Sequence, residues 1–281
     1  MSWSPRVLWL SVAGLLIVTL GIVVAVTRDP NDVVVMQRRM PPAVSAAPVP
    51  ATVPAAAPAP STLKKISYWG TPSGFPRDPA PDSLEPVKEG LRPHGKVAVY
   101  DAPGGKARAF LPTDISGLPV TVPIVARRPG WVAVLLPSVN RRVGWLPLTS
   151  GDVRPLHDQL IVDLSDRRLT WLRDGQERGS WEVSIGSRRT PTPLGRTYVM
   201  GHTITSGRVY AGEDAIVLGA VPDDKDALSA SLRNGHTAIH AWSDSSAFGR
   251  DISNGCIRLP AKVQRTLLKS IGLGAVVHVV E

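Results

Sequence analysis

The sequence contains a single cysteine, Cys256, within the segment Ser-Asn-Gly-Cys-Ile-Arg at 253–258. A lone cysteine excludes an intramolecular disulfide and a zinc cluster with several cysteine ligands, so its thiol is either a small buried core group or a reactive one. Gly255 beside it permits unusual backbone angles and close approach of a substrate. The preceding stretch 243–251 is polar, which suits solvent access. Together these features favour an accessible, reactive thiol.

Catalysis by a thiol requires a partner that makes or stabilises the thiolate. A free cysteine has a pKa of about 8.5, so only a few per cent is ionised at neutral pH. Histidine is the usual partner, and the sequence has six, at positions 94, 157, 202, 236, 240 and 278. Spacing alone does not identify which histidine meets the thiol.

Several ordered sequence blocks surround the cysteine. Ala-Ile-His-Ala-Trp at 238–242 is followed, sixteen residues after its histidine, by Cys256 in Ser-Asn-Gly-Cys-Ile-Arg. Residues 160–175 read as a hairpin, and Thr190–Met200 contains Thr-Pro-Leu-Gly before a strand. These blocks resemble the YkuD-type L,D-transpeptidases, whose signature joins an Ile-His strand end to Ser/Thr-His/Asn-Gly-Cys-x-Arg. The resemblance covers about 125 residues.

The resemblance implies a role for each residue of this signature. It makes Cys256 the nucleophile and His240 the general base that takes its proton. It makes the loop Ser253, Asn254 and Gly255 the oxyanion-binding segment, with backbone N–H groups near Gly255 and Cys256 as donors. Arg258 positions substrate or the loop, and a structural salt bridge is an equally good reading. No cofactor and no metal are implied.

Two positions depart from the commoner family pattern. Asn254 stands where many relatives have a second histidine, so a proton relay there is lost, although Asn still forms hydrogen bonds. Ala241 replaces the Gly or Ser that often follows the base. That change is harmless if only the main-chain carbonyl at this position orients the imidazole.

The implied chemistry is acyl transfer on peptidoglycan stem peptides. The Cys256 thiolate attacks the carbonyl that joins a diamino acid to the terminal D-Ala of a tetrapeptide stem, D-Ala leaves, and a thioester remains. An amine of a neighbouring stem then forms a cross-link. Water as acceptor would make the enzyme an L,D-carboxypeptidase, and an amine on a protein would make it a protein-to-peptidoglycan anchoring enzyme. Carbapenem-type β-lactams are expected to acylate the same sulfur.

Two other classes of function are open to this sequence. A metal hydrolase is one, because His236 and His240 have the spacing of a helical zinc pair. However, the general-base Glu is missing, and on a strand the two side chains lie about 13 Å apart. The other is a non-catalytic cell-wall-binding protein whose transpeptidase-like domain has decayed. Retention of His240, Gly255, Cys256 and Arg258 in order argues against decay.

The first 28 residues read as a membrane anchor or signal segment. Val7–Val26 carries no charge, and 20 helical residues span the roughly 30 Å hydrocarbon layer. A cleaved signal peptide has a shorter apolar core, so an uncleaved single-pass anchor is favoured. The flanking positive charges leave the orientation ambiguous. The implied chemistry places the catalytic domain on the extracytoplasmic, cell-wall side.

A spacer and irregular linker follow at 29–90. Residues 40–62 are almost all Pro and Ala, a composition that cannot bury a core and favours extended polyproline geometry. Residues 66–90 contain five prolines and are expected either to continue the linker or to pack as a collar.

Residues 91–150 contain short β-type runs at close spacing, at 96–100, 120–126, 131–136 and 143–146. Turn signals at Pro103-Gly104-Gly105 and Pro129-Gly130 separate them, as in a small barrel. With its two Gly-Trp pairs, at Trp131 and Trp145, the segment resembles a bacterial Src-homology-3-like domain. Such a domain binds cell-wall peptides or packs against a catalytic domain; the two tryptophans read equally well as core aromatics.

Residues 156–281 are expected to form a mainly β catalytic domain, a YkuD-like β-sandwich. Strands are predicted at 159–164, 168–173, 180–186, 197–200, 215–220, 237–240 and 275–280. One helix is predicted after the cysteine, with Pro260 at its first position and Gly272 at its end.

The net charge of +9 suggests attraction to an anionic surface such as a cell-wall polymer or membrane headgroups. The sequence shows no interleaved aromatic and basic element, so nucleic acid is not expected as a partner.

Overall fold

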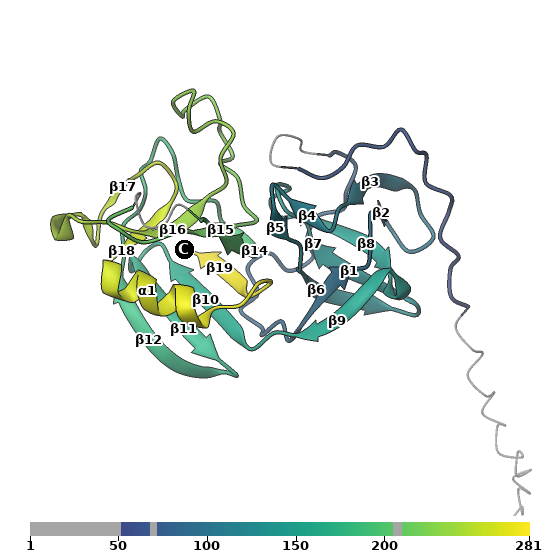
Figure 1. The fold of residues 1–281 in the computed structure, drawn as a ribbon, viewed down its shortest axis with the longest axis horizontal. Coiled ribbons are helices and arrows are strands. Elements are labelled where there is room, and N and C mark those ends of the chain that lie inside the picture. Colours follow the sequence, from purple (N-terminus) through teal and green to yellow (C-terminus); the bar gives the residue numbers. More distant parts are fainter. Residues whose placement is uncertain (1–51, 68–71, 205–209) are drawn as a thin grey trace, which may run out of the picture. The chain divides into compact units, whose positions relative to one another are not determined.

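The structure is a computed structural model that describes residues 52–67, 72–204 and 210–281 (Figure 1). The chain divides into two units, Met1–Val49 and Pro50–Glu281. The predicted anchor Val7–Val26 and most of the Pro/Ala spacer lie outside the described residues. Within the described ranges, no helix has both the length and the apolar character needed to cross a bilayer.

The first half of the described chain forms a seven-stranded sheet with the order β3-β2-β8-β7-β6-β1-β9. Four of its strands lie where the sequence predicted them, and β1, β3 and β9 were not predicted, because their apolar runs are short. The strands are β1 (Glu89–Pro93), β2 (Val97–Tyr100), β3 (Ala107–Leu111), β6 (Val122–Arg128), β7 (Trp131–Leu135), β8 (Val143–Pro147) and β9 (Gly151–Pro155); a small hairpin, β4 (Asp114–Ile115) and β5 (Leu118–Pro119), and a 3-10 turn, Leu148–Ser150, complete this region.

The linker before this sheet packs as a collar. Ile66 and Phe75 are buried in the core of the first sheet. The N–H of Ile66 donates to the Phe110 carbonyl, and the N–H of Phe110 donates to the Lys64 carbonyl, so the linker pairs with β3. Burying these side chains removes apolar surface from water and holds the linker in place.

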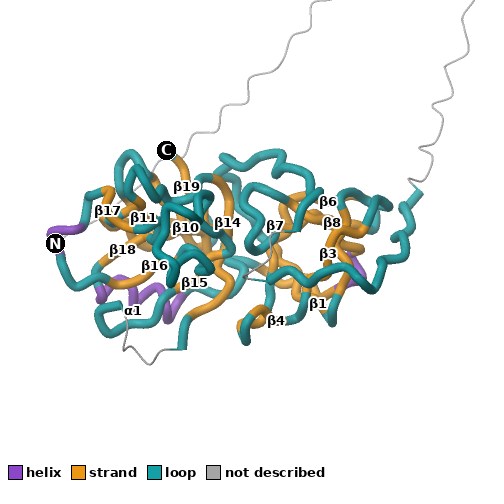
Figure 2. The backbone as a smooth tube through the Cα atoms, turned by 90° about the horizontal axis from the view of Figure 1, so that it is seen from above, coloured by secondary structure: helices purple, strands orange, loops and turns teal. Residues whose placement is uncertain are grey.

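The second half forms an eight-stranded sheet with the order β12-β11-β10-β19-β14-β15-β16-β18 (Figures 1 and 2). The sheet contains all seven strands predicted here, with shifted ends, and an eighth, β18, which was not predicted. They are β10 (Asp158–Asp163), β11 (Arg168–Arg173), β12 (Gln176–Glu182), β14 (Gly195–His202), β15 (Ile216–Leu218), β16 (Ala238–Ala241), β18 (Ile257–Leu259) and β19 (Val276–Val280); β13 (Ile185–Gly186) and β17 (Asp251–Ser253) form a separate pair, and Ser245–Ala247 is a 3-10 turn.

One α-helix, α1 (Ala261–Ser270), occurs in the described part of the chain, and Figure 2 shows it along one side of these strands. Pro260 is its N-cap rather than its first helical residue, because its ψ of 142° is extended. Leu267 is fully buried, and the Gln264 side chain donates to the Ile239 carbonyl (3.1 Å), which ties the helix to β16. The prediction of a mainly β fold with a short helix after the cysteine is confirmed.

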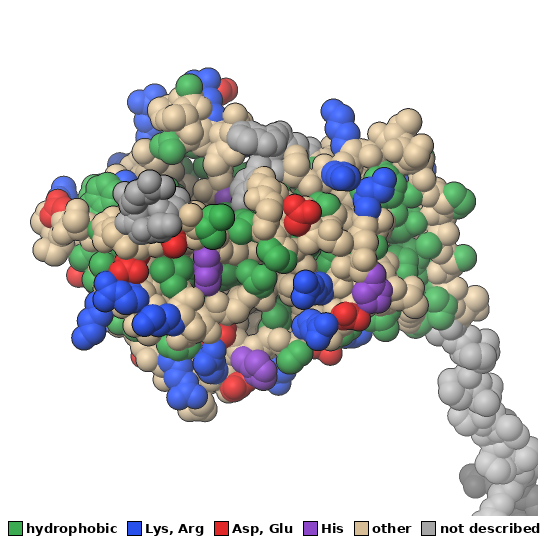
Figure 3. Space-filling view, in the orientation of Figure 1, with side chains coloured by type: hydrophobic (Ala, Val, Ile, Leu, Met, Phe, Trp, Pro, Cys, Tyr) green, Lys and Arg blue, Asp and Glu red, His purple; other side chains and the backbone are tan. Residues whose placement is uncertain are grey.

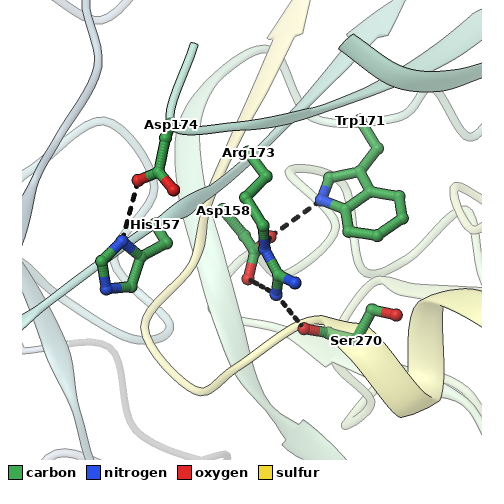
Figure 4. Close-up of polar contacts among 6 residues, drawn as sticks. All are labelled: His157, Asp158, Trp171, Arg173, Asp174 and Ser270. Atoms are coloured by element: carbon green, nitrogen blue, oxygen red, sulfur yellow. Dashed lines mark hydrogen bonds and ion pairs between the residues drawn. The ribbon is translucent and has the colours of Figure 1, made fainter. Parts of the chain in front are cut away.

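A polar cluster fixes the β10–β11 hairpin to the end of α1 (Figure 4). The buried carboxylate of Asp158 accepts hydrogen bonds from Trp171 Nε1 (2.8 Å) and from the guanidinium of Arg173 (2.9 and 3.0 Å). Arg173 also donates to the Ser270 carbonyl (2.8 Å) at the last helical residue. Every charge in this cluster has a partner, which indicates a structural role.

A buried ion pair ties the collar to the second sheet. The guanidinium of Arg196, on β14, donates through Nε to Asp78 Oδ2 (2.9 Å) and through Nη2 to the other carboxylate oxygen. The two side chains are 6% and 0% exposed. Such a pair is costly to break, because the remaining charge stays buried without a counterion.

Charged side chains are spread over the face shown in Figure 3, with acidic groups among the basic ones. No single basic patch dominates that face, so the net charge of +9 does not by itself mark a binding surface there.

Candidate active site

Two neighbouring parallel strands bring His240 and Cys256 to one face of the sheet. In the register of β16 with β18, Ile239 pairs with Ile257 and His240 pairs with Arg258. Both isoleucines are fully buried in the domain core. Because side chains alternate along a strand, His240 and Arg258 point to the opposite face. Cys256, directly before β18 and two residues before Arg258, shares that face.

The register also gives the separation of the thiol and the imidazole. Cys256 lies one strand away from His240 and two residues back along the strand direction. Spacings of about 4.8 Å between strands and 3.3 Å per residue put their Cα atoms about 8 Å apart. The thiol and the imidazole extend from those backbones on the same face, so their side chains are within reach of each other.

The imidazole of His240 is held in one tautomer. The residue is 3% exposed, and Nδ1 lies 2.8 Å from the Ala241 carbonyl oxygen. A carbonyl only accepts, so Nδ1 carries the proton and Nε2 keeps its lone pair. Burial lowers the pKa of His240 to about 4, against the raising effect of the Ala241 hydrogen bond and with a further lowering by the Arg258 charge. The ring is therefore a neutral acceptor at physiological pH.

The Cys256 thiol is less accessible than its polar approach loop suggested. Burial raises the pKa of the thiol, while a backbone hydrogen bond with Ala238 and the Arg258 charge act in the opposite direction. The residue keeps part of its surface exposed. A protonated thiol beside a neutral imidazole needs the base to remove its proton during the reaction.

The loop before the cysteine is fixed by a single serine. Ser253 is buried; its hydroxyl donates to the Cys256 carbonyl (2.5 Å) and accepts from the Gly255 N–H (3.1 Å). Gly255 has φ +102°, a conformation that side-chain-bearing residues rarely adopt. The Gly255 N–H is therefore used inside the loop and is not available to a substrate oxyanion. Asn254 is exposed at the loop tip.

Arg258 lies over the indole of Trp242, with 3.8 Å from its guanidinium carbon to the ring centroid. Its Nε is buried and has no hydrogen-bond partner in the described part of the chain. Burial lowers the pKa of Arg258. Among the described residues it forms no salt bridge, so the structural-pair reading of this residue has no support there.

Two aromatic residues of the site were not predicted. The Tyr210 ring lies 4.1 Å from the His240 ring, centroid to centroid, and tilted by 35°. The Trp242 ring meets the same imidazole edge-on at 6.0 Å. Trp242 is the last residue of the 238–242 block and was detectable from that position. Tyr210 comes from a long loop, and only an aromatic within a polar stretch hints at it.

The remaining histidines lie outside this face. His236 Nδ1 is bonded to the Leu218 carbonyl (2.7 Å) and Nε2 to the Ser138 hydroxyl (3.1 Å), so it does not share a ligand with His240. In the described ranges, no group of three or more His, Cys, Asp or Glu side chains has a metal-binding arrangement. His94 and His157 form exposed pairs with Asp152 and Asp174, the latter visible in Figure 4, and His202 and His278 lie on strands of the second sheet.

Comparison with known proteins identifies the second half of the chain. Residues 157–279 match the YkuD family model, described as the L,D-transpeptidase catalytic domain. A comparison with curated proteins gives no match.

Solved structures of L,D-transpeptidases are also similar to this chain. An Enterococcus faecium mutant enzyme is 20% identical with a TM-score of 0.34, over 46% of this chain and 55% of that one. An enzyme from Mycobacterium tuberculosis H37Rv is 16% identical with a TM-score of 0.39, over 73% of this chain and 100% of that one. The avibactam carbamoyl enzyme of Ldtfm is 19% identical with a TM-score of 0.36, over 60% of this chain and 71% of that one. The chain thus spans about half the length of the first of these. The family finding for this chain is the match of residues 157–279 to the YkuD model, the L,D-transpeptidase catalytic domain.

Proposed function

We propose that this protein is an L,D-transpeptidase that forms peptidoglycan cross-links through a thioester on Cys256. The single observation that carries the proposal is the shared face of β16 and β18, on which a neutral His240 offers Nε2 beside the Cys256 thiol. The YkuD match over 157–279 supports the reaction class.

In the first half-reaction, His240 Nε2 takes the thiol proton as sulfur attacks the carbonyl between the diamino acid and the terminal D-Ala of a tetrapeptide stem. The tetrahedral oxyanion accepts a hydrogen bond from the Cys256 N–H, a term typically worth roughly 3 to 4 kcal/mol per donor. His240 then gives its proton to the leaving D-Ala amine. The C–N bond breaks, and a thioester remains on Cys256.

In the second half-reaction, an amine from a neighbouring stem attacks the thioester carbonyl. His240 takes a proton from that amine, the C–S bond breaks, and the thiol is regenerated by proton return. Water in place of the amine yields a shortened stem, and a protein amine yields a wall-anchored protein.

Arg258 is proposed to bind a carboxylate of the stem peptide. Its guanidinium stacks on Trp242 and its buried Nε has no partner among the described residues. A carboxylate would satisfy that donor with a charge-assisted hydrogen bond.

The protein is proposed to act on the extracytoplasmic side of the cell membrane, because its substrate is there. The apolar run Val7–Val26 as an anchor and the Pro/Ala spacer after it suit that location. The first sheet is proposed to be a Src-homology-3-like domain that lies before the catalytic domain.

Muropeptide analysis with wild type, Cys256→Ala and His240→Gln tests the function. Wild type is expected to create bonds between the diamino acids of two stems, and each variant is expected to lose activity by roughly a thousandfold or more. Tripeptides without new bonds would indicate a carboxypeptidase. Bound but unchanged muropeptides would indicate a non-catalytic wall-binding protein.

Covalent labelling gives a second readout. A carbapenem is expected to add its mass to wild type and not to Cys256→Ala. Wild-type activity is also expected to survive EDTA. Loss of activity on adding the chelator alone would contradict the cysteine mechanism.

A further inference from the structure

Two aromatic side chains of the first sheet have polar tips that are satisfied by a distant segment of the chain. Tyr100, the last residue of β2, and Trp131, the first of β7, form an edge-to-face pair with 5.2 Å between ring centroids and 89° between planes. They are only 4% and 2% exposed. Buried Tyr and Trp need a partner for O–H and N–H, or the burial costs free energy.

The partners are main-chain carbonyls of the Pro/Ala spacer. Trp131 Nε1 donates to the Pro54 carbonyl (2.8 Å), and the Tyr100 hydroxyl donates to the Ala57 carbonyl (2.8 Å). Burial also raises the pKa of Tyr100, which keeps its hydroxyl protonated and able to donate. Both hydrogen bonds are made to main-chain carbonyls of the spacer and not to its side chains.

The three-residue spacing of these carbonyls fits a polyproline II ligand. That helix has three residues per turn and a rise of about 3.1 Å per residue, so carbonyls at i and i+3 lie on the same side, about 9 Å apart. Residues 53–60 read Val-Pro-Ala-Ala-Ala-Pro-Ala-Pro, a composition that favours this conformation before any contact is made. Aromatic surfaces that bind such segments gain from their low conformational entropy.

Two turn glycines give the segment room to lie flat on the sheet. A Cβ at Gly104 would come within 2.9 Å of the Pro54 side chain, and one at Gly130 would overlap the Val53 side chain. Both glycines have positive φ, +69° and +71°, so the turns themselves also require glycine.

The segment lies on the surface and is not part of the core. Val53 is 55% exposed, and residues 54–56 are exposed as well. In contrast, Ile66, a few residues later, is buried and pairs with β3. The short connection between the two holds residues 53–60 beside the aromatic pair at a high effective concentration, about millimolar for short links.

We propose that Tyr100, Trp131, Gly104 and Gly130 form a recognition site for an extended Pro/Ala-rich peptide, and that residues 53–60 of the same chain are its resident ligand. The described end of the spacer, residues 53–60, is therefore held on the first sheet. The site is a separate binding element from the Cys256 face.

The indole N–H of Trp131 reports occupancy of this site in the full chain. The protein has eight tryptophans, so ¹⁵N-Trp labelling gives eight indole signals, and Trp131→Phe assigns the relevant one. Replacement of residues 53–58 by Gly and Ser at constant length is expected to speed hydrogen exchange at the Trp131 indole about tenfold or more, since protection then depends on a poorly pre-organised segment. The other indoles serve as internal controls. Unchanged exchange at Trp131 would overturn the proposal.

A fluorescently labelled peptide with the sequence of residues 52–61 tests recognition directly. The peptide is expected to bind the Gly/Ser variant saturably. At about 10 µM it should not bind wild type, because residues 53–60 of the same chain already fill the site at an effective concentration of about millimolar. Adding Tyr100→Phe to the Gly/Ser variant removes one hydrogen bond but keeps the ring, and is expected to weaken binding about threefold to tenfold. Tyr210→Phe, in the loop between β14 and β15 and beside the His240 ring, is the matched control and leaves peptide binding unchanged.

Two results would contradict the assignment. Equal peptide affinity with Tyr100 and with Tyr100→Phe would show that the hydroxyl's hydrogen bond to the peptide carbonyl does not contribute to recognition. Trp131 protection that is lost on dilution, together with concentration-dependent dimers, would show that the occupant is the spacer of a second copy.

Discussion

The imidazole of His240 donates through Nδ1 to the main-chain carbonyl of Ala241, 2.8 Å away. The contact uses no side-chain atom of Ala241, which is fully buried. The tautomer of the base is therefore set by the backbone of β16, and the side chain at 241 matters only through its size.

Ala241→Ser should accordingly retain activity within about threefold, because the carbonyl remains and the added atom is small. Ala241→Leu should lose stability or activity, since overpacking of a buried site costs about 1 to 3 kcal/mol. Steady-state kinetics and thermal unfolding check both variants. A tenfold loss with serine would mean that the side chain itself takes part.

Activity should be nearly constant from about pH 5 to above pH 8, because the lowered pKa of His240, about 4, leaves the base neutral throughout. The raised pKa of Cys256 keeps the thiol protonated over the same range. Activity should fall only as the pH drops toward 4 and His240 takes up a proton. The pH profile of kcat/KM is the measurement, and an inflection near pH 6.5 would contradict it.

The Tyr210 ring should maintain that low pKa by keeping water from the imidazole. Tyr210→Ala is expected to move the acid limb of the kcat/KM profile upward, toward the ordinary histidine pKa of about 6.5. Tyr210→Phe keeps the stacked ring and should leave the limb in place. If both variants move the acid limb upward by the same amount, the phenol hydroxyl and not the ring maintains the low pKa of His240.

Asp78→Asn should destabilise the protein by about 3 kcal/mol or more, because it leaves the buried Arg196 charge without a counterion. Asp223→Asn is the matched control: its partner Arg141 and its own side chain are 43% and 44% exposed, and such a pair contributes about 1 kcal/mol or less. Chemical denaturation of both variants gives the comparison. Equal effects would mean that the Asp78 pair is well solvated in solution.

Stability should fall as the pH decreases from 6.5 to 4. Burial is the main cause that lowers the pKa of His236, His240 and His278 to about 4 in the folded state. Below pH 6.5 the unfolded chain binds these protons and the folded chain does not, so each histidine costs up to about 3 kcal/mol by pH 4. Above pH 6.5 these histidines are neutral in both the folded and the unfolded chain, so they no longer lower the free energy of unfolding.

Denaturation midpoints between pH 4 and 7 test this dependence. His278→Leu should reduce the slope, because one of the histidines whose pKa is lowered by burial is lost. A slope unchanged by that substitution would assign the pH dependence to other groups.

Much of the active-site face could be predicted from sequence. The run ending at His240 predicted a strand, which the structure has as β16, whereas β18, which begins at Ile257, was not predicted. The ordered motif blocks led to the prediction that Cys256 and His240 act together. Local pattern is sufficient for β16 because side chains alternate along any strand and the apolar residues mark its buried face. The positions of β1, β3 and β9 were missed, since their short runs form strands only by pairing with distant partners.

The sequence by itself determined which residues are candidates for the chemistry, namely Cys256, His240 and Gly255. Only the tertiary structure decided their state. The parallel pairing of β16 with β18 sets the distance from Cys256 to His240, and Tyr210, from a distant loop, places its ring 4.1 Å from the imidazole. Burial, pKa and the partner of Trp131 depend on contacts between segments far apart in the chain, and no local pattern encodes those contacts.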